Sequence, residues 1–259
     1  MTKALAVGVL IATLGGLIGL GGAEFRLPLL IGVFGFAALP AVILNKSMSL
    51  VVVAAALLFR IRIVPAEAVL AHWLIIVNLL AGSLAGAWMG AGWATQLKSQ
   101  TLCRVIAVLL VGIAIVLVFG HLLMGRSEPW VTGWLQIVAG VVAGFGIGVV
   151  ASLLGVAGGE LLIPTRVIRF GADIKLAGSL SLAVSLPTMI VGFIRYSRDG
   201  SFAVLTTHKR FVVVMALGLI VGAWLGGLLL GIVPDAVLLP MLALILLISS
   251  VKVWRHADT

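Results

Sequence analysis

The sequence predicts an all-α polytopic membrane protein built from two tandem repeats, on the evidence of its composition, its apolar segments and an internal duplication. Hydrophobic residues make up 63% of the 259 residues and charged residues only 10%, against about 25% charged in an average globular domain. So little polar material cannot cover a soluble body of this size. We therefore expect a multi-pass protein whose main surroundings are membrane lipid.

Apolar segments follow one another along the chain at the length that a bilayer helix needs, about 20 residues. They lie at 4–22, 27–40, 41–59, 66–90, 102–123, 132–156, 161–170, 176–194, 208–231 and 235–253. The segments 27–40 and 161–170 are too short to cross and indicate broken or re-entrant helices. The prediction is about four spans in each repeat, so eight in total, or ten if the short segments also cross.

The first segment follows the basic Lys3, as the apolar core of a signal peptide would. No small-x-small cleavage site follows it, and its glycine-rich end recurs far downstream. We expect a retained first helix.

A shift of 136 residues places the second half of the chain on the first. The identical residues that then coincide are Leu17 with Leu153, Gly19 with Gly155, Gly22 with Gly158, Glu24 with Glu160, Pro28 with Pro164, His72 with His208 and Trp88 with Trp224. With a four-residue gap, 46–50 falls on 178–182. The predicted organisation is a first repeat at 1–124, a connecting loop at 125–131 and a second repeat at 132–259. Duplicated halves are typical of secondary transporters, whose substrate site lies between the repeats.

The charge pattern limits the classes of partner that the protein can have and indicates its orientation in the membrane. The net charge of +9 would suggest nucleic acid in a soluble protein, but basic residues at helix ends are explained by cytoplasmic loops and anionic lipid. Both span counts place both termini in the cytoplasm. The sequence leaves open whether the two repeats are parallel or inverted and whether the protein forms a homodimer.

Cys103 is the only cysteine, which excludes an intramolecular disulfide, a cysteine-rich metal site and a dithiol relay. We expect no metal and no cofactor.

The strongest motif runs from Gly19 to Pro28 and has its partner from Gly155 to Pro164. Its glycines let the backbone leave the helix with positive φ, and the proline can occupy the first turn of a new helix. The N–H groups of such a break form an anion-binding concavity. The candidate backbone positions are Gly21, Gly22, Gly158 and Gly159. The alternative is that the glycines only allow close helix packing.

Glu24 and Glu160 are ionisable groups within apolar segments, where such groups are costly and functional by default. A carboxyl group of this kind suits proton binding and release during a transport cycle. Alternatively, each glutamate caps the N–H groups of its own half-helix.

Lys46 opens an otherwise apolar helix together with Asn45 and Ser47. The ammonium can neutralise an anion while the amide and hydroxyl bind its oxygens. The aligned segment of the second half lacks the cation but keeps the hydroxyls of Ser179 and Ser181. The alternatives are that Lys46 snorkels to an interface or pairs with Glu24. Arg26 is a weaker candidate, because its counterpart is Leu162.

The remaining motifs predict structure. Glycines spaced by four residues in 82–90 and 218–226 favour helix packing over ligand binding. His72 and His208 fall near helix starts, where positioning at the interface is favoured over a proton relay. No paired nucleophile and base, phosphate loop or carboxylate cluster indicates an enzyme.

These motifs resemble the TauE/SafE sulfite exporter family, also called the toluene-sulfonate uptake permease family. Its members have a similar length, two repeated four-helix halves and a Gly-x-Gly-Gly-Gly-x-x-x-x-Pro signature in each half; here Ala23 and Ala157 each replace one glycine. The stretch 176–181 is similar to the Ala-x-Gly-Thr-Ser stretch of the family, whereas 45–47 departs from it. The resemblance implies an ion-coupled secondary carrier in a bacterial plasma membrane that moves sulfite, sulfoacetate or other organosulfonates, in either direction.

The expected function is therefore transport of a small oxyanion, with alternating access produced by rocking of one half against the other. A membrane scaffold whose glycine motifs serve only packing is the alternative from another class. An intramembrane enzyme ranks third.

Overall fold

The computed structural model describes residues 2–18, 22–60, 71, 73–123, 133–158, 174–228 and 235–257. Every regular element in these ranges is a helix, so the predicted all-α class is confirmed. The helices are α1 (Thr2–Ile18), α2 (Ala23–Gly32), α3 (Ala38–Arg60), α5 (Trp73–Gln96), α6 (Ser99–Leu123), α7 (Trp134–Leu154), α9 (Ile174–Tyr196), η1 (Gly200–Ala203), α10 (Val204–Thr207), α11 (Lys209–Leu228) and α12 (Asp235–Ala257).

Several of these helices are long and apolar enough to cross a membrane. Four are candidate spans in the described residues: α5, α7, Ser99–Val116 of α6 and Lys209–Gly226 of α11. A fifth is bent by 104° between Leu180–Tyr196 and Gly200–Thr207. The chain is therefore a multi-pass membrane protein, while the count of eight or ten spans stays a prediction. The predicted loop at 125–131 and the short segment 161–170 lie outside the described residues.

The first glycine motif breaks the chain between α1 and α2. Gly22 precedes α2 with φ 66°, in the left-handed region that glycine adopts without strain. At 10 residues and 1.5 Å of rise per residue, α2 is about 15 Å long and too short to cross a bilayer. A turn containing Gly35, with φ 71°, then separates α2 from α3, so the predicted segment 27–40 divides between two helices.

The position predicted for Pro28, in the first turn of the new helix, is wrong. Because α2 already begins at Ala23, Pro28 is its sixth residue and lies inside the helix. The first turn closes where the Arg26 N–H donates to the Gly22 carbonyl oxygen at 3.2 Å. Proline has no N–H to donate to the carbonyl oxygen of Glu24, so the proline loosens the backbone of the same turn that carries the charged residues.

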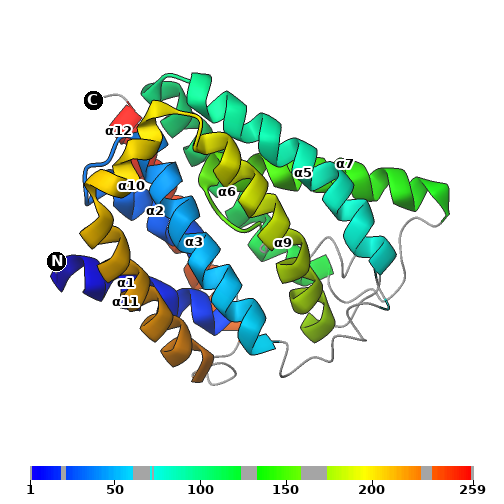
Figure 1. Ribbon diagram of the computed structural model, residues 1–259. Coiled ribbons are helices and arrows are strands. Elements are labelled where there is room, and N and C mark those ends of the chain that lie inside the picture. The colour runs from blue at the N-terminus through cyan, green and yellow to red at the C-terminus, as the bar shows by residue number, and fades with distance from the viewer. Residues whose placement is uncertain are drawn as a thin grey trace.

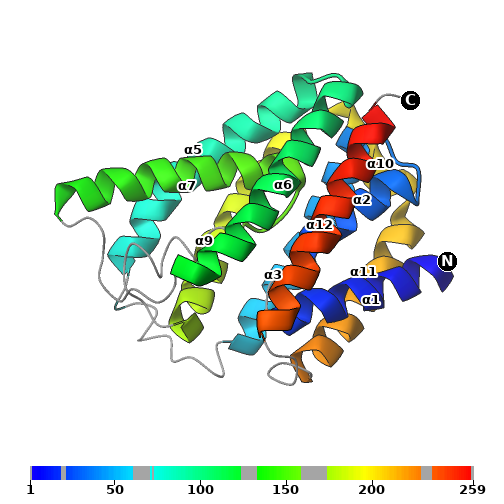
Figure 2. The same cartoon turned by 180° about the vertical axis from the view of Figure 1, so that it is seen from behind.

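Two tight helix pairs flank the central helix α3. Figures 1 and 2 show α1 beside α11 and α5 beside α7, and these two pairs make the most extensive contacts between elements. The helices α6 and α12 form a third pair, while α9 lies between α5 and α3. Each of the pairs joins a helix from the first half of the chain to one from the second.

Glycines bring both tight pairs to backbone contact, as the glycine stripes predict. A Cβ atom on Gly82 would lie 1.9 Å from the carbonyl oxygen of Val141, and one on Gly218 would lie 2.6 Å from that of Leu5. Gly86 and Gly222 meet the carbonyl oxygens of Phe145 and Val9 in the same way, at 2.1 and 2.2 Å. The two members of each pair of contacts correspond through the repeat: Gly82 and Gly86 match Gly218 and Gly222, and Val141 and Phe145 match Leu5 and Val9, all at a shift of 136 residues.

A matched pair of alanine substitutions tests this packing. Gly86→Ala places a methyl group against the α7 backbone, whereas nothing lies within 4 Å of a Cβ atom on Gly112 in α6. We expect Gly86→Ala to lower the free energy of unfolding by about 1–3 kcal/mol, the usual cost of overpacking. Gly112→Ala should leave it unchanged or raise it slightly. Thermal unfolding in detergent measures both, and equal melting temperatures would contradict the close contact.

Candidate functional site

Arg26 is fully buried between α2 and α3, although an arginine is rarely buried without a partner. Its Nε donates to Asn45 Oδ1 at 2.6 Å, and its Nη2 donates to the carbonyl oxygen of Asn45 at 2.9 Å and to Ser49 Oγ. No described residue accepts a hydrogen bond from its Nη1. The guanidinium is thus held in one orientation with donor capacity to spare.

Asn45 joins the two halves of the chain at this point. Its Nδ2 donates to the carbonyl oxygen of Ala23, at the start of α2, and to that of Leu154, at the end of α7. These distances are 3.0 and 2.8 Å. One side chain therefore fixes the start of α2, the end of the helix before the second motif and the guanidinium of Arg26.

Lys46 is also fully buried and turns toward α7. Its Nζ donates to the carbonyl oxygen of Ala151 at 3.4 Å and to Ser152 Oγ at 3.3 Å. Gly192 of α9 gives it room, because a Cβ atom there would lie 2.8 Å from Nζ. This burial excludes snorkelling to an interface.

Ser152 is itself held by two other helices. Its Oγ donates to the carbonyl oxygen of Ala87 in α5 at 3.0 Å, and its own carbonyl oxygen accepts from the hydroxyl of Tyr196 in α9 at 2.9 Å. The ammonium of Lys46 therefore lies where α3, α5, α7 and α9 converge.

The buried charges do not balance among the described residues. Glu24 is the one buried carboxylate there, and it interacts electrostatically with Arg26. Against it stand the buried guanidinium of Arg26 and the buried ammonium of Lys46. We name Glu24, Arg26, Asn45, Lys46 and Ser49 the polar centre.

The structure shows the expected backbone break at two of the predicted binding positions and brings the start of the second motif to Lys46. Gly22 and Gly158 both have positive φ, at 66° and 75°. The second motif also meets α3 directly, since a Cβ atom on Gly155 would lie 2.4 Å from the carbonyl oxygen of Val42 and 3.1 Å from the N of Lys46. The second glycine motif thus begins against the residues that carry the polar centre.

Other predicted positions lie elsewhere or cannot be placed. The hydroxyl of Ser47 bonds back to the carbonyl oxygen of Leu44 at 2.8 Å, within its own helix. Ser181 is buried on α9. The predicted positions outside the described residues are Gly21, Gly159, Glu160, His72 and the side chain of Ser179.

A family model described as Sulfite exporter TauE/SafE matches residues 4–253. The chain belongs to this family. Members of the TauE/SafE family are membrane transporters and not enzymes. Neither the curated proteins nor the solved structures contain a match to this TauE/SafE protein.

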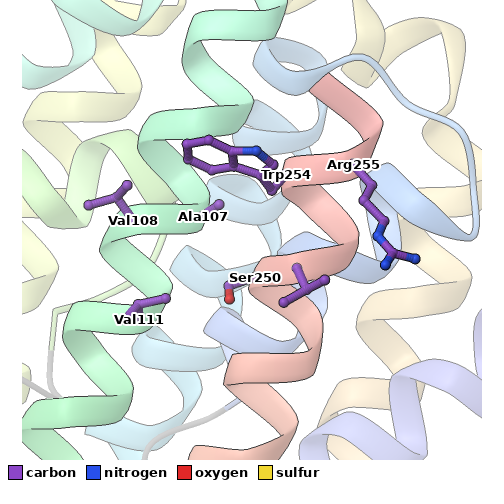
Figure 3. Close-up of a pocket in the computed structure, with 7 residues that line it drawn as sticks. Ala107, Val108, Val111, Ser250, Trp254 and Arg255 are labelled. Atoms are coloured by element: carbon purple, nitrogen blue, oxygen red, sulfur yellow. The ribbon is translucent and has the colours of Figure 1, made fainter. Parts of the chain in front are cut away.

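A groove between α6 and α12 lies apart from the polar centre of this TauE/SafE protein. It has a volume of about 280 Å³ and is lined by Ala107, Val108, Val111, Ser250, Val251, Trp254 and Arg255, most of which Figure 3 labels. Its walls are largely apolar, and none of the predicted binding residues lines it. An oxyanion needs convergent donors and positive charge, so the polar centre is the better candidate site.

The sequence indicated some members of this site and missed others. Arg26 ranks low in the sequence because Leu162 replaces it in the second half, yet its side chain donates three hydrogen bonds to Asn45 and Ser49. Ser152 and Tyr196 carry no motif. A sequence feature that could have indicated Tyr196 is that it is the only tyrosine of the chain and lies just after the apolar segment 176–194.

Removing the Asn45 amide tests the junction. Asn45→Ala removes the acceptor of Arg26 Nε and the donor to two carbonyl oxygens, and unmet buried groups cost about 1–3 kcal/mol each. We expect a loss of unfolding free energy of about 3 kcal/mol or more. Ser47→Ala on the same helix should stay within about 0.5 kcal/mol. Thermal unfolding in detergent gives both values, and similar losses for the two variants would refute the junction.

Proposed function

We propose that this protein transports small sulfur-containing oxyanions, such as sulfite, sulfoacetate and other organosulfonates. The observation that carries the proposal is the excess of positive charge in the polar centre, where Arg26 and Lys46 are both fully buried and Glu24 is the one buried carboxylate among the described residues. An unbalanced buried cation is costly. An anionic substrate that enters the centre offsets this cost.

The donors of the polar centre suit an oxyanion. Nη1 of Arg26 is uncommitted among the described residues, and the two hydrogen bonds of Lys46 Nζ are long, at 3.3 and 3.4 Å. A guanidinium presents its N–H groups as a planar fork, and an ammonium adds three donors. The positive end of α2, next to Gly22, adds a favourable partial charge. These donors match the several oxygens of a sulfite or sulfonate group.

Proton coupling is assigned to Glu24, with Glu160 as its counterpart in the second repeat. Glu24 interacts electrostatically with Arg26, so an oxyanion bound at Arg26 would compete with the carboxylate. A carboxylate displaced in this way binds a proton more readily. Substrate binding and proton binding are then linked through one guanidinium.

Alternating access by two repeats completes the proposal. Its support is the recurrence of the Gly82 and Gly86 contacts at Gly218 and Gly222, displaced by 136 residues on both sides. The polar centre lies between elements of both halves, where carriers of this kind bind substrate. We place the protein in the bacterial inner membrane with both termini in the cytoplasm.

A membrane scaffold is the second candidate, because glycines do pack α5 against α7 and α1 against α11. Packing accounts for the glycines but gives no reason to bury Arg26 and Lys46. Radiolabelled sulfite or sulfoacetate flux into proteoliposomes separates the two functions, and absence of flux for both anions would favour the scaffold.

Neutralising the cations tests the site. Arg26→Gln and Lys46→Gln should each lower sulfite flux in proteoliposomes by about tenfold or more, because a hydrogen bond to a charged group contributes about 1.5–3 kcal/mol. Arg198→Gln is the matched control, since Arg198 is exposed and stacks on Trp88 at 4.9 Å. Unchanged flux in the Arg26 and Lys46 variants, with folding intact, would overturn the assignment.

Neutralising both glutamates tests the coupling. The double variant Glu24→Gln and Glu160→Gln should still exchange labelled sulfite across the membrane but lose accumulation driven by a pH gradient. Glutamine keeps the size and much of the hydrogen bonding while removing the titrating group. Gradient-driven accumulation equal to that of the unaltered protein would show that neither carboxyl group couples the cycle.

A further inference from the structure

The second half of the chain contributes hydroxyl groups to the buried interior where the first half contributes cations. Ser181, Ser185 and Thr188 lie on α9 with exposed fractions of 3%, 1% and 2%. Their spacing of four and three residues places them on one helix face. On the same face, Gly192 lies against Lys46. We name Ser181, Ser185, Thr188 and its neighbour Ser83 of α5 the hydroxyl track.

The two ends of the hydroxyl track differ in how they are bonded. Thr188 Oγ1 donates to the carbonyl oxygen of Val184 at 2.7 Å and lies 2.8 Å from Ser83 Oγ. The hydroxyls of Ser181 and Ser185 are buried and have no hydrogen-bond partner among the described residues. A buried hydroxyl without a partner is unfavourable, so these two groups are suited to a ligand that arrives from outside.

The duplication explains why Ser181 has no hydrogen-bond partner among the described residues. The gapped alignment places Ser181 on Ser49, whose hydroxyl accepts from the Arg26 guanidinium. The sequence counterpart of Arg26 is Leu162. Position 181 therefore keeps the hydroxyl of the repeated motif while the second half has lost the cation.

We propose that the hydroxyl track is the route along which the oxyanion reaches Lys46. This inference rests on the proposed function and adds to it the residues that line the path. Serine and threonine hydroxyls donate to oxyanion oxygens without adding charge, so they replace part of the hydration shell and still let the ion move on. From Ser181 to Gly192 the helix rises about 16 Å, and the path ends at the buried ammonium.

Cysteine accessibility tests the route, since Cys103→Ala yields a background without cysteine. Ser181→Cys and Ser185→Cys are treated with anionic methanethiosulfonate ethylsulfonate in membranes. Leu180→Cys is the matched control, because Leu180 is fully buried on the same helix but, one residue before Ser181, lies off the face of the track. The two track cysteines should react at least about tenfold faster than the control, because the reagent must reach the thiolate. Excess ethanesulfonate should slow them.

Other outcomes overturn the inference. Equal rates at positions 180, 181 and 185 would show that no route follows this face. A faster reaction with the cationic trimethylammonium analogue would indicate a path for cations or water. If sulfite flux still depends on Arg26 and Lys46 while both track cysteines are unreactive, the route fails and the proposed function stands. If flux does not depend on those cations, the proposed function fails whatever the cysteines show.

Alanine variants keep the test independent of cysteine tolerance. Ser185→Ala should lower sulfite flux about tenfold, the effect of one lost hydrogen bond to a charged group. Ser197→Ala is the control, because Ser197 is exposed at the end of α9 and its hydroxyl returns to the carbonyl oxygen of Ile194. Equal flux in both variants would exclude Ser185 from the route.

Discussion

The two hydrogen bonds donated by the Asn45 amide determine where the rest of the interior lies. They hold the start of α2 and the end of α7 against the same point of α3, and the oxygen of the same side chain orients Arg26. In a bilayer, backbone groups at a helix break must find partners inside the protein. Asn45 satisfies one such group, the carbonyl oxygen of Leu154 at the end of α7, and joins it to the start of α2.

The polar centre follows from this junction. Because Asn45 occupies the junction, its neighbour Lys46 points to the end of α7, and Ser49, one turn further along α3, reaches Arg26. Little more than one turn of α3, from Asn45 to Ser49, thus collects the guanidinium, the ammonium and the two backbone breaks. The close approach of Gly155 to Lys46 shows why the second motif tolerates no side chain there.

The sequence predicted the helices well because the length of an apolar segment and the positions of the glycines that interrupt it are local properties of the chain. Gly22 and Gly158 have the positive φ expected of a break, and the glycine stripes pack as their spacing indicates. The exact start of α2 was not predictable, and Pro28 was misplaced as a result. Arg26 was undervalued because repeat matching favours residues present twice, whereas its bonds to Asn45 and Ser49 depend on how two helices cross.

The crossing contacts of the tight pairs have a mechanical consequence. The pair α1 and α11, like the pair α5 and α7, unites helices from opposite halves at backbone distance, so rocking of one repeat against the other has to slide or separate helices that touch along their backbones. The hydrogen bonds of Asn45 and Lys46 from α3 to α7 cross the same boundary between the halves. The repeats inherited by duplication are therefore interlocked, and any alternation between them has to break and remake these contacts.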